Sequence, residues 1–314
     1  GTDPRKAKVV PYFQNRALQA LKNVFMLFPQ ADRNRTIFRG EGDAFLMGVH
    51  HPDVFATVDV AQFAPWSAKW SERLWLMVGK REWGLKNEHG VSVWDWNDPI
   101  WHSKTYPKKA WSFFSVCQSP NYSKGDNKTY WENMGFPKFY LDLQAEKRGG
   151  RWWWVDIGDA PNGKASLAPM NEAYPAFTNV NFCEVPRKQW RREPRGTLNG
   201  YLSWGPNGGY LRKLRKQKEL AAKLAEGMKT VDTAERFEMA VRIGDHGLRQ
   251  NGQSVPPTNA KFGRTDITLW RLQQFKVAPG KTYTWTNVKV ATGQVLQAGT
   301  VKPDDRDLLT IPGF

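Results

Sequence analysis

The chain is poor in the residues that most often carry catalysis or hold metals. Its 314 residues include only two cysteines and five histidines, and these show no metal-ligand spacing. No apolar run approaches the length of a membrane-spanning helix. Cys117 and Cys183 lie far apart, so one disulfide and two buried free thiols are both open. The sequence therefore predicts no metal, no cofactor and no membrane span.

Acidic residues are scarce relative to basic ones. Thirty Asp and Glu face 46 Lys and Arg, and the net charge of +16 favours contact with polyanions such as nucleic acid or acidic polysaccharide. The basic residues are spread along the chain without a nucleic-acid motif, which favours a solvated basic surface over a dedicated polyanion site. Residues 1–11 are polar and basic, show no signal peptide, and are expected to form a loose arm.

What the sequence does contain is apolar and aromatic. Hydrophobic residues make up 40% of the chain and tryptophans number 16, a composition that argues against disorder. The length suffices for two domains with separate cores. We expect an α/β domain followed by an all-β sandwich. The predicted parts are an α/β domain at 12–168 with a Trp-rich, loop-rich insertion at 62–109, an irregular linker at 169–195, and a β-sandwich at 196–314.

The central unit of the first domain runs from Arg35 to Ala61. A short apolar strand at 36–38 leads into a Gly-rich turn, an apolar helical segment at 44–49 and a second strand at 54–60. Such a unit is typical of a βαβ crossover in a parallel sheet, where chemistry lies at the carboxyl ends of strands. Around it the patterns predict helices at 12–28 and 139–147 and strands at 110–118 and 151–157.

The segment Leu21 to Ala56 resembles the middle of an α/β-hydrolase of the secreted esterase and peptidase-like type. The resemblance is carried by FPQADRNR at 28–35 and HPDVFA at 51–56, which flank the position of the nucleophile elbow. It implies a hydrolase-like sheet with helices in the first domain. The C-terminal motifs PGKTYTWTN and LLTIPGF are similar to motifs of the immunoglobulin-like domain that follows this hydrolase type. The resemblance also implies a secreted or periplasmic protein.

The sequence departs from this family at its catalytic residues. The family's elbow is G-x-S-x-G, but no Ser or Cys lies between Thr36 and Val60. The resemblance places the degenerate elbow at Gly40, Glu41, Gly42 and Asp43, the acid slot at Asp126, and the histidine slot at Asp159 and Ala160.

The two acids of the elbow have two interpretations. Asp43 or Glu41 could replace serine as a nucleophile, but that chemistry still needs a histidine base. We favour a tight turn in which both acids cap the following helix.

The five histidines do not form a recognisable catalytic set. His50 and His51 close the helix after the elbow, where we expect them to complement the helix end. His89 and His102 lie in the insertion and could reach a cleft. His246 lies in the motif GDHG, which is similar to the G-x-H-G motif that carries the catalytic histidine in this hydrolase type. Because GDHG lies between predicted sandwich strands, in the wrong domain, we interpret the similarity as a coincidence.

Two surfaces are candidates for binding. Aromatic platforms suit carbohydrate or protein partners, and the candidate residues are Trp66, Trp70, Trp94, Trp96, Trp152, Trp153 and Trp154. A basic amphipathic helix is predicted at 211–228 within the second domain. Packing of its apolar stripe on its own domain is favoured over docking to a partner.

The strand at 36–38 poses a further problem. An α/β-hydrolase builds several strands before its nucleophile, but only one predicted helix precedes Arg35. That strand would carry an open edge, so we expect a second protein chain or self-association to complete the sheet, with a contracted domain as the alternative.

These observations lead us to expect a catalytically degenerate α/β-hydrolase-like protein that acts as a binding or structural component of an assembly. The alternative is an active esterase with a displaced or non-standard catalytic set near Gly40–Asp43.

Overall fold

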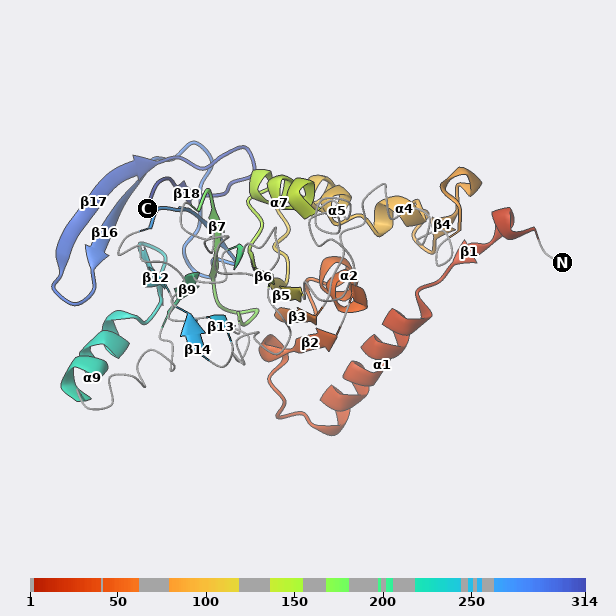
Figure 1. Cartoon of the computed structure of the whole chain (residues 1–314), viewed down its shortest axis with the longest axis horizontal. Helices are drawn as coiled ribbons and strands as arrows, with labels where there is room; N and C mark the ends of the chain where they lie inside the picture. Colours follow the sequence, from red (N-terminus) through yellow and green to blue (C-terminus); the bar gives the residue numbers. More distant parts are fainter. Residues whose placement is uncertain are drawn as a thin grey trace.

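The structure is a computed structural model, shown in Figure 1. It describes residues 3–40, 42–61, 79–118, 136–154, 168–180, 197–198, 202–205, 218–243, 248–250, 253–255 and 263–314. Within these ranges the chain combines a mainly parallel sheet and its helices with small antiparallel sheets in the C-terminal half. The expected change from α/β to β structure is confirmed at this level.

The parallel sheet is the centre of the N-terminal half. Its strand order is β2 (Ile37–Gly40), β3 (Thr57–Ala61), β5 (Phe113–Gln118), β6 (Gly150–Trp154) and β8 (Thr197–Leu198). The first four strands are parallel and β8 is antiparallel to β6. Helix α2 (Gly42–His50) connects β2 to β3, which confirms the predicted crossover.

Three helices accompany this sheet at the predicted places or near them. Helix α1 (Tyr12–Leu27) precedes β2, and α7 (Phe136–Ala145) precedes β6. Apolar residues of α2, β3 and β5 form the main core, to which Leu143 of α7 contributes. Helix α1 packs only partly buried residues against that core and contains no buried residue. Among the described helices, none has the length and apolar character that crossing a membrane requires.

Helix α2 lies so close to the sheet that one position tolerates no side chain. A Cβ added at Gly48 would lie 2.6 Å from Cγ2 of Val58 on β3 and 2.8 Å from Cε1 of Phe114 on β5. Both partners are fully buried, so neither has room to move. The glycine therefore sets the distance between α2 and the two central strands.

The N-terminal arm and the insertion are more ordered than their composition suggests. The arm was predicted to be loose, but β1 (Lys8–Val9) pairs in parallel with β4 (Lys86–Asn87) in the insertion. The insertion, predicted to be loop-rich, also contains η4 (Arg81–Trp83), α4 (Val93–Trp96) and α5 (Pro99–Thr105). Side chains of Ser92 and Asp98 accept the first free N–H groups of α4 and α5.

The segment predicted as an irregular linker contains a buried strand. Strand β7 (Tyr174–Thr178) pairs with β15 (Asp266–Trp270), which in turn pairs with β18 (Thr310–Ile311). Every residue of β7 is buried. The prediction of an irregular segment was wrong here because backbone pairing and burial against distant residues determine the local structure.

The remaining described strands form two-stranded antiparallel sheets. The pairs are β9 (Leu202–Trp204) with β12 (Val241–Ile243), β10 (Val231–Asp232) with β11 (Phe237–Glu238), β13 (Leu248–Gln250) with β14 (Gln253–Val255), and β16 (Tyr283–Lys289) with β17 (Gln294–Val301). Helix α9 (Lys218–Gly227) covers the described part of the predicted basic helix. Short alternating strands were expected throughout this half, and antiparallel pairing is what the described residues show.

The two halves share an apolar core. One cluster combines Phe113 of β5 with Tyr174 and Ala176 of β7, Trp270 of β15 and Leu308. The cluster therefore spans the predicted boundary at 168–196 and packs the antiparallel strands against the parallel sheet.

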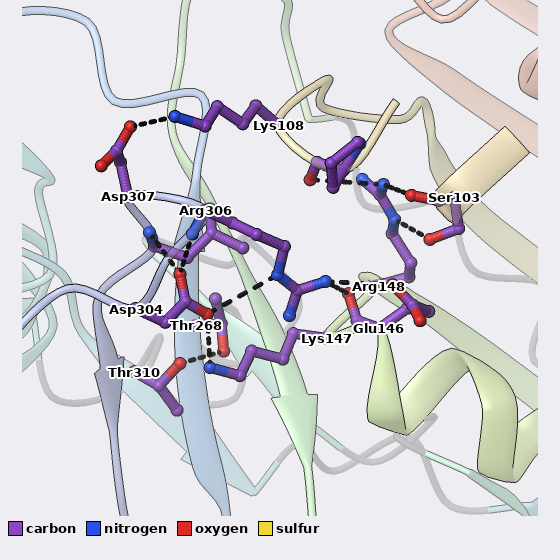
Figure 2. Close-up of polar contacts among 12 residues, drawn as sticks. Ser103, Lys108, Glu146, Lys147, Arg148, Thr268, Asp304, Arg306, Asp307 and Thr310 are labelled. Carbon is purple, nitrogen blue, oxygen red and sulfur yellow. Dashed lines mark hydrogen bonds and ion pairs between the residues drawn. The ribbon is translucent and has the colours of Figure 1, made fainter. Parts of the chain in front are cut away.

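Ion pairs fasten the loop between β17 and β18 to the end of α7 (Figure 2). Lys147 Nζ lies 2.8 Å from Asp304 Oδ2, and Arg306 Nη1 lies 3.0 Å from Glu146 Oε2. The side chain of Asp304 also accepts the backbone N–H groups of residues 306 and 308, which shapes the loop. These four partners are largely shielded from water, so their pairing orients the loop more effectively than exposed pairs would.

Two arginines hold neighbouring loops together by donating hydrogen bonds to neutral oxygens. Arg148 is almost wholly buried, with its guanidinium over the rings of Trp111 and Trp270 at 4.8 and 4.7 Å. It donates to the Ser103 hydroxyl and to the carbonyls of residues 103, 106 and 109. Burial lowers the pKa of Arg148 to about 10, so it stays charged at neutral pH. Arg271 similarly donates to the carbonyls of residues 111 and 168.

Candidate functional site

The elbow-like turn lies at the carboxyl end of β2, where the sequence predicted it. Gly40 ends the strand and Gly42 begins α2, so Asp43 belongs to the first turn of that helix. A carboxylate in the first turn is favourable for the helix dipole. Glu41 and the side chain of Asp43 lie outside the described residues. Beside the turn, Arg39 Nε lies 2.8 Å from Oδ2 of Asp59, its partner in register on β3.

Most of the other predicted site residues fall outside the described ranges. These are the acid slot Asp126, the histidine slot Asp159 and Ala160, His246, Cys183, and Trp66 and Trp70. Trp152, Trp153 and Trp154 belong to β6, but only their backbone is described. Trp94 and Trp96 lie on α4 in the insertion. The structure therefore describes the elbow turn and α4, and the predictions for the other site residues remain untested.

Trp96 is the centre of a cluster of histidines from distant parts of the chain. The imidazole of His50, from α2, stacks on its indole with ring centroids 4.7 Å apart. His102 of α5 meets the same indole edge-on at 4.8 Å, and His89 lies 5.5 Å away. His50 and His102 are themselves 5.2 Å apart. Four histidines that the sequence left unconnected, counting His51 next to His50, thus gather around one aromatic residue.

The hydrogen bonds of this cluster define the protonation of its rings. Nε2 of His50 lies 2.7 Å from the carbonyl oxygen of Trp96, and Nε2 of His102 lies 2.6 Å from the same oxygen. Because a carbonyl only accepts, both Nε2 atoms carry the proton. Nδ1 of neutral His50 then accepts from Nε2 of Gln14 at 2.9 Å. Oε1 of the same Gln14 amide accepts from Nε2 of His51 at 3.2 Å.

Burial keeps these imidazoles neutral. It lowers the pKa of His50 to about 3 and that of His102 to about 4, and in each case the hydrogen bond to Trp96 opposes only part of the shift. Burial also lowers the pKa of His51, against the attraction of Asp53. His50 therefore stands at the end of α2 as a neutral polar residue, and its ring, bonded to Trp96, carries no charge to offer the helix dipole.

The cluster borders a cavity of about 320 Å³. Its walls come from the arm and the start of α1, from the end of α2, and from the insertion around α4 and β4. His89 therefore does reach a cavity, as its place in the insertion suggested, and so do His50 and His51. His102 is not among the described residues that line the cavity, and it donates Nε2–H to the carbonyl of Trp96.

The cluster does not have the composition of a catalytic or metal centre. Nucleophilic chemistry needs a Ser, Cys or carboxylate within hydrogen-bond reach of a base. The two most buried imidazoles, His50 and His102, instead donate their N–H groups to the carbonyl of Trp96. Among the residues described, no group of three or more His, Cys, Asp or Glu is placed to hold a metal ion. The arrangement suits binding, since neutral rings and amides can donate or accept without moving a proton.

Sequence reasoning missed Asn87 and Gln14, the two amides at this site. Gln14 bridges two histidines, and Asn87 uses its Oδ1 to accept the backbone N–H groups of residues 89 and 91 at 3.0 Å each. The motif NEHG at 87–90 begins with Asn and ends with Gly, two residues typical of turns, and this pattern could have identified Asn87 as a turn residue. No local signal marks Gln14, because its partners are 36 and 37 residues away.

The second notable surface is the outer side of β2. Among the strands that the structure describes, β2 lies at the edge of the sheet, as the sequence predicted. Ile37 on this strand is 48% exposed, and large apolar side chains at the end of α1 are exposed as well. The α1–β2 surface, as we name it, consists of Val24, Met26, Leu27, Phe28 and Ile37.

In comparisons with known proteins, no family model, no curated protein and no solved structure matches this chain.

Proposed function

We propose that this protein is a catalytically degenerate α/β-hydrolase-like protein with an immunoglobulin-like C-terminal domain, and that it serves outside the cytoplasm as a binding component of an assembly. The observations that carry the proposal are the position of β2 at the edge of the sheet among the described strands and the exposed apolar side chains of Ile37 and of the end of α1. An unpaired strand edge offers a row of free N–H and C=O groups to another chain. Exposed apolar residues on the α1–β2 surface would be buried by the same contact.

Charge favours a different chain over a second copy as the partner. Residues 12–40 contain five basic residues and one acidic residue, and the whole chain carries +16. Two copies meeting through this surface would bring like charges together, which opposes association. An acidic partner chain that adds a strand to β2 would pair the N–H and C=O groups of the strand edge and would complement the positive charge of residues 12–40.

The particle mass of protein from its natural source tests this proposal. Light scattering after size exclusion should give a mass above that of one chain of the same material measured under denaturing conditions. Ile37→Lys places a charge on the edge strand and should return the mass to that of one chain. Val295→Lys is the matched control, since Val295 is 57% exposed on β17 and lies away from the proposed contact.

Either of two results would contradict the proposal. A mass equal to that of one chain of the same material under denaturing conditions means that the edge of β2 is tolerated without a partner. A larger mass that Ile37→Lys leaves unchanged means that the partner binds elsewhere.

The competing function, an active esterase near Gly40–Asp43, has its own test. Hydrolysis of p-nitrophenyl butyrate by the purified chain should not exceed the rate in buffer. Hydrolysis that Asp43→Asn abolishes would overturn the degenerate interpretation and make Asp43 the nucleophile.

A further inference from the structure

The arm and the insertion place two lysines side by side. Strands β1 and β4 are parallel, and their register pairs Lys8 with Lys86 and Val9 with Asn87. Residues paired in this way point to the same face of a sheet, and neighbouring strands lie about 4.8 Å apart. Figure 1 shows the two strands at the end of the molecule where the N-terminal arm begins. Lys8 and Lys86, which are far apart in sequence, thus form one lysine pair.

The lysine pair lies on the face of the ladder that is open to water. Exposure alternates along both strands, with Lys8 and Lys86 exposed, Val9 partly buried and Asn87 buried. Within the part of the chain that the structure describes, neither lysine forms an ion pair. The carboxylate of Glu88, the acidic residue nearest to Lys86 in sequence, instead lies 3.9 Å from Nε2 of His89. Both ammonium groups are therefore available to an anion from outside.

The pairing of the two lysines opposes the ladder that holds them. Like charges directly opposite one another destabilise neighbouring strands, and this ladder has only two residue pairs. The surrounding sequence does not compensate, because residues 3–9 and 62–90 contain eight basic and four acidic residues. One of these acids, Asp3, is already paired with Arg5 at 2.9 Å. An anion bound between the ammonium groups would replace their repulsion with attraction.

The lysine pair favours a particular kind of anion. An ammonium group is a compact point charge that suits sulfate and phosphate groups. A sulfated sugar can carry two such groups on one ring, close enough to meet two adjacent lysines. Nucleic acids are typically held through a longer series of about 6–10 phosphate contacts. Two neighbouring lysines match the sulfated sugar better than the nucleic-acid backbone.

We propose that Lys8 and Lys86 bind the sulfate groups of an acidic polysaccharide. Each ammonium group meets one sulfate, and the sugar lies across the outer face of β1 and β4. The charge of +16 attracts the polymer to the molecule as a whole, and the lysine pair determines where it binds. The site shares no residue with the α1–β2 surface, so it does not depend on the proposed partner chain.

Binding of dextran sulfate to the full chain tests the proposal, with neutral dextran as the reference ligand. The double variant Lys8→Gln, Lys86→Gln should weaken binding about tenfold. It should also lower the slope of log affinity against log salt concentration by about 2, because two ionic contacts are lost. Both positions are exposed and the substitutions remove a repulsion, so the urea midpoint should not fall.

The matched control is the double variant Lys289→Gln, Lys302→Gln. It removes the same charge from two exposed lysines, one at the end of β16 and one just after β17. Figure 1 shows these strands at the opposite end of the molecule from β1 and β4. The control should weaken binding less than about twofold and leave the salt slope unchanged. In the wild type, dextran sulfate should slow hydrogen exchange in β1 and β4 and not in β16 and β17.

Three results would overturn the proposal. The first is that dextran sulfate binds no better than neutral dextran. The second is an equal loss of affinity in the two double variants, which would mean that diffuse charge attracts the polymer without a site. The third is tighter binding of a single-stranded oligothymidylate with the same number of charges, which would make this face a nucleic-acid site.

Discussion

Acidification is expected to destabilise this protein through His50 and His102. Both rings are buried and both donate Nε2–H to the carbonyl of Trp96. Burial lowers the pKa of His50 to about 3 and that of His102 to about 4, while an imidazole in the unfolded chain has a pKa near 6.5. Between pH 6.5 and about 4 the unfolded chain therefore binds two protons that the folded chain does not, and stability falls as the pH falls.

The size of this loss of stability follows from the lowered pKa values of His50 and His102. Each pH unit below 6.5 costs about 1.4 kcal/mol per imidazole, so lowering the pH from 7 to 5 costs about 2 kcal/mol for each ring. The two rings together account for about 4 kcal/mol. That is a large part of the roughly 5–15 kcal/mol by which native proteins are stable.

Urea unfolding at pH 7 and pH 5 measures the effect. In the double variant His50→Gln, His102→Gln, the glutamine amides still donate to Trp96 but do not titrate, so the loss between the two pH values should be about 4 kcal/mol smaller than in the wild type. The control is His89→Gln, because the side chain of His89 is 62% exposed. If the double variant loses as much stability on acidification as the wild type, the two rings are not the proton-binding groups.

Two further predictions concern the packing of the fold. Gly48→Ala should lower the urea midpoint by the equivalent of about 1–3 kcal/mol, since the new methyl group meets Val58 and Phe114 at 2.6 and 2.8 Å; an unchanged midpoint would show that α2 can move away from the sheet. Arg148→Met should cost about 3–5 kcal/mol because several buried carbonyls lose their donor. Lys108→Ala, which removes a half-exposed ion pair with Asp307, should cost less than about 1 kcal/mol, and equal losses in the two variants would contradict this account.

The elements that periodicity specifies were predictable from the sequence. Helix α1 follows its apolar spacing from Tyr12 and ends next to Pro29, and the unit from β2 to β3 follows its alternation of strand and helix patterns. Local signals also existed for α5, where Asp98 precedes Pro99, but the many tryptophans, glycines and charges around it obscured them.

Strand β7 shows why other elements could not be predicted. It contains Pro175 and lies in a segment rich in proline, and both features argue against a strand. Its partner β15 is about 90 residues further along the chain. Burial of Tyr174 and Phe177 against that partner decides the structure, and no local pattern contains this information.

The candidate site was partly visible in the sequence. Trp96 was predicted as a binding residue because it belongs to the Trp-rich insertion, and His89 was predicted only to be able to reach a cleft from there. The pairing of His50 with Trp96 joins residues 46 positions apart, and the bridge through Gln14 depends on how α1 lies against α2. Side chains that converge through tertiary packing carry no sequence spacing that could reveal them.

The core shared by the two halves has a consequence for the order in which the chain can fold during synthesis. Phe113 and Tyr174 are covered by Trp270 and Leu308, and Glu146 and Lys147 meet their partners only at Arg306 and Asp304. These contacts link residues that are 96 or more positions apart, Tyr174 and Trp270 being the nearest in sequence, and they cannot all form until nearly the whole chain has left the ribosome. A nascent chain that already holds β2, β3 and β5 must therefore wait with an apolar sheet face uncovered. Residues 12–168 made alone would keep that face exposed permanently, so this segment should depend on chaperones or aggregate rather than fold as an independent unit.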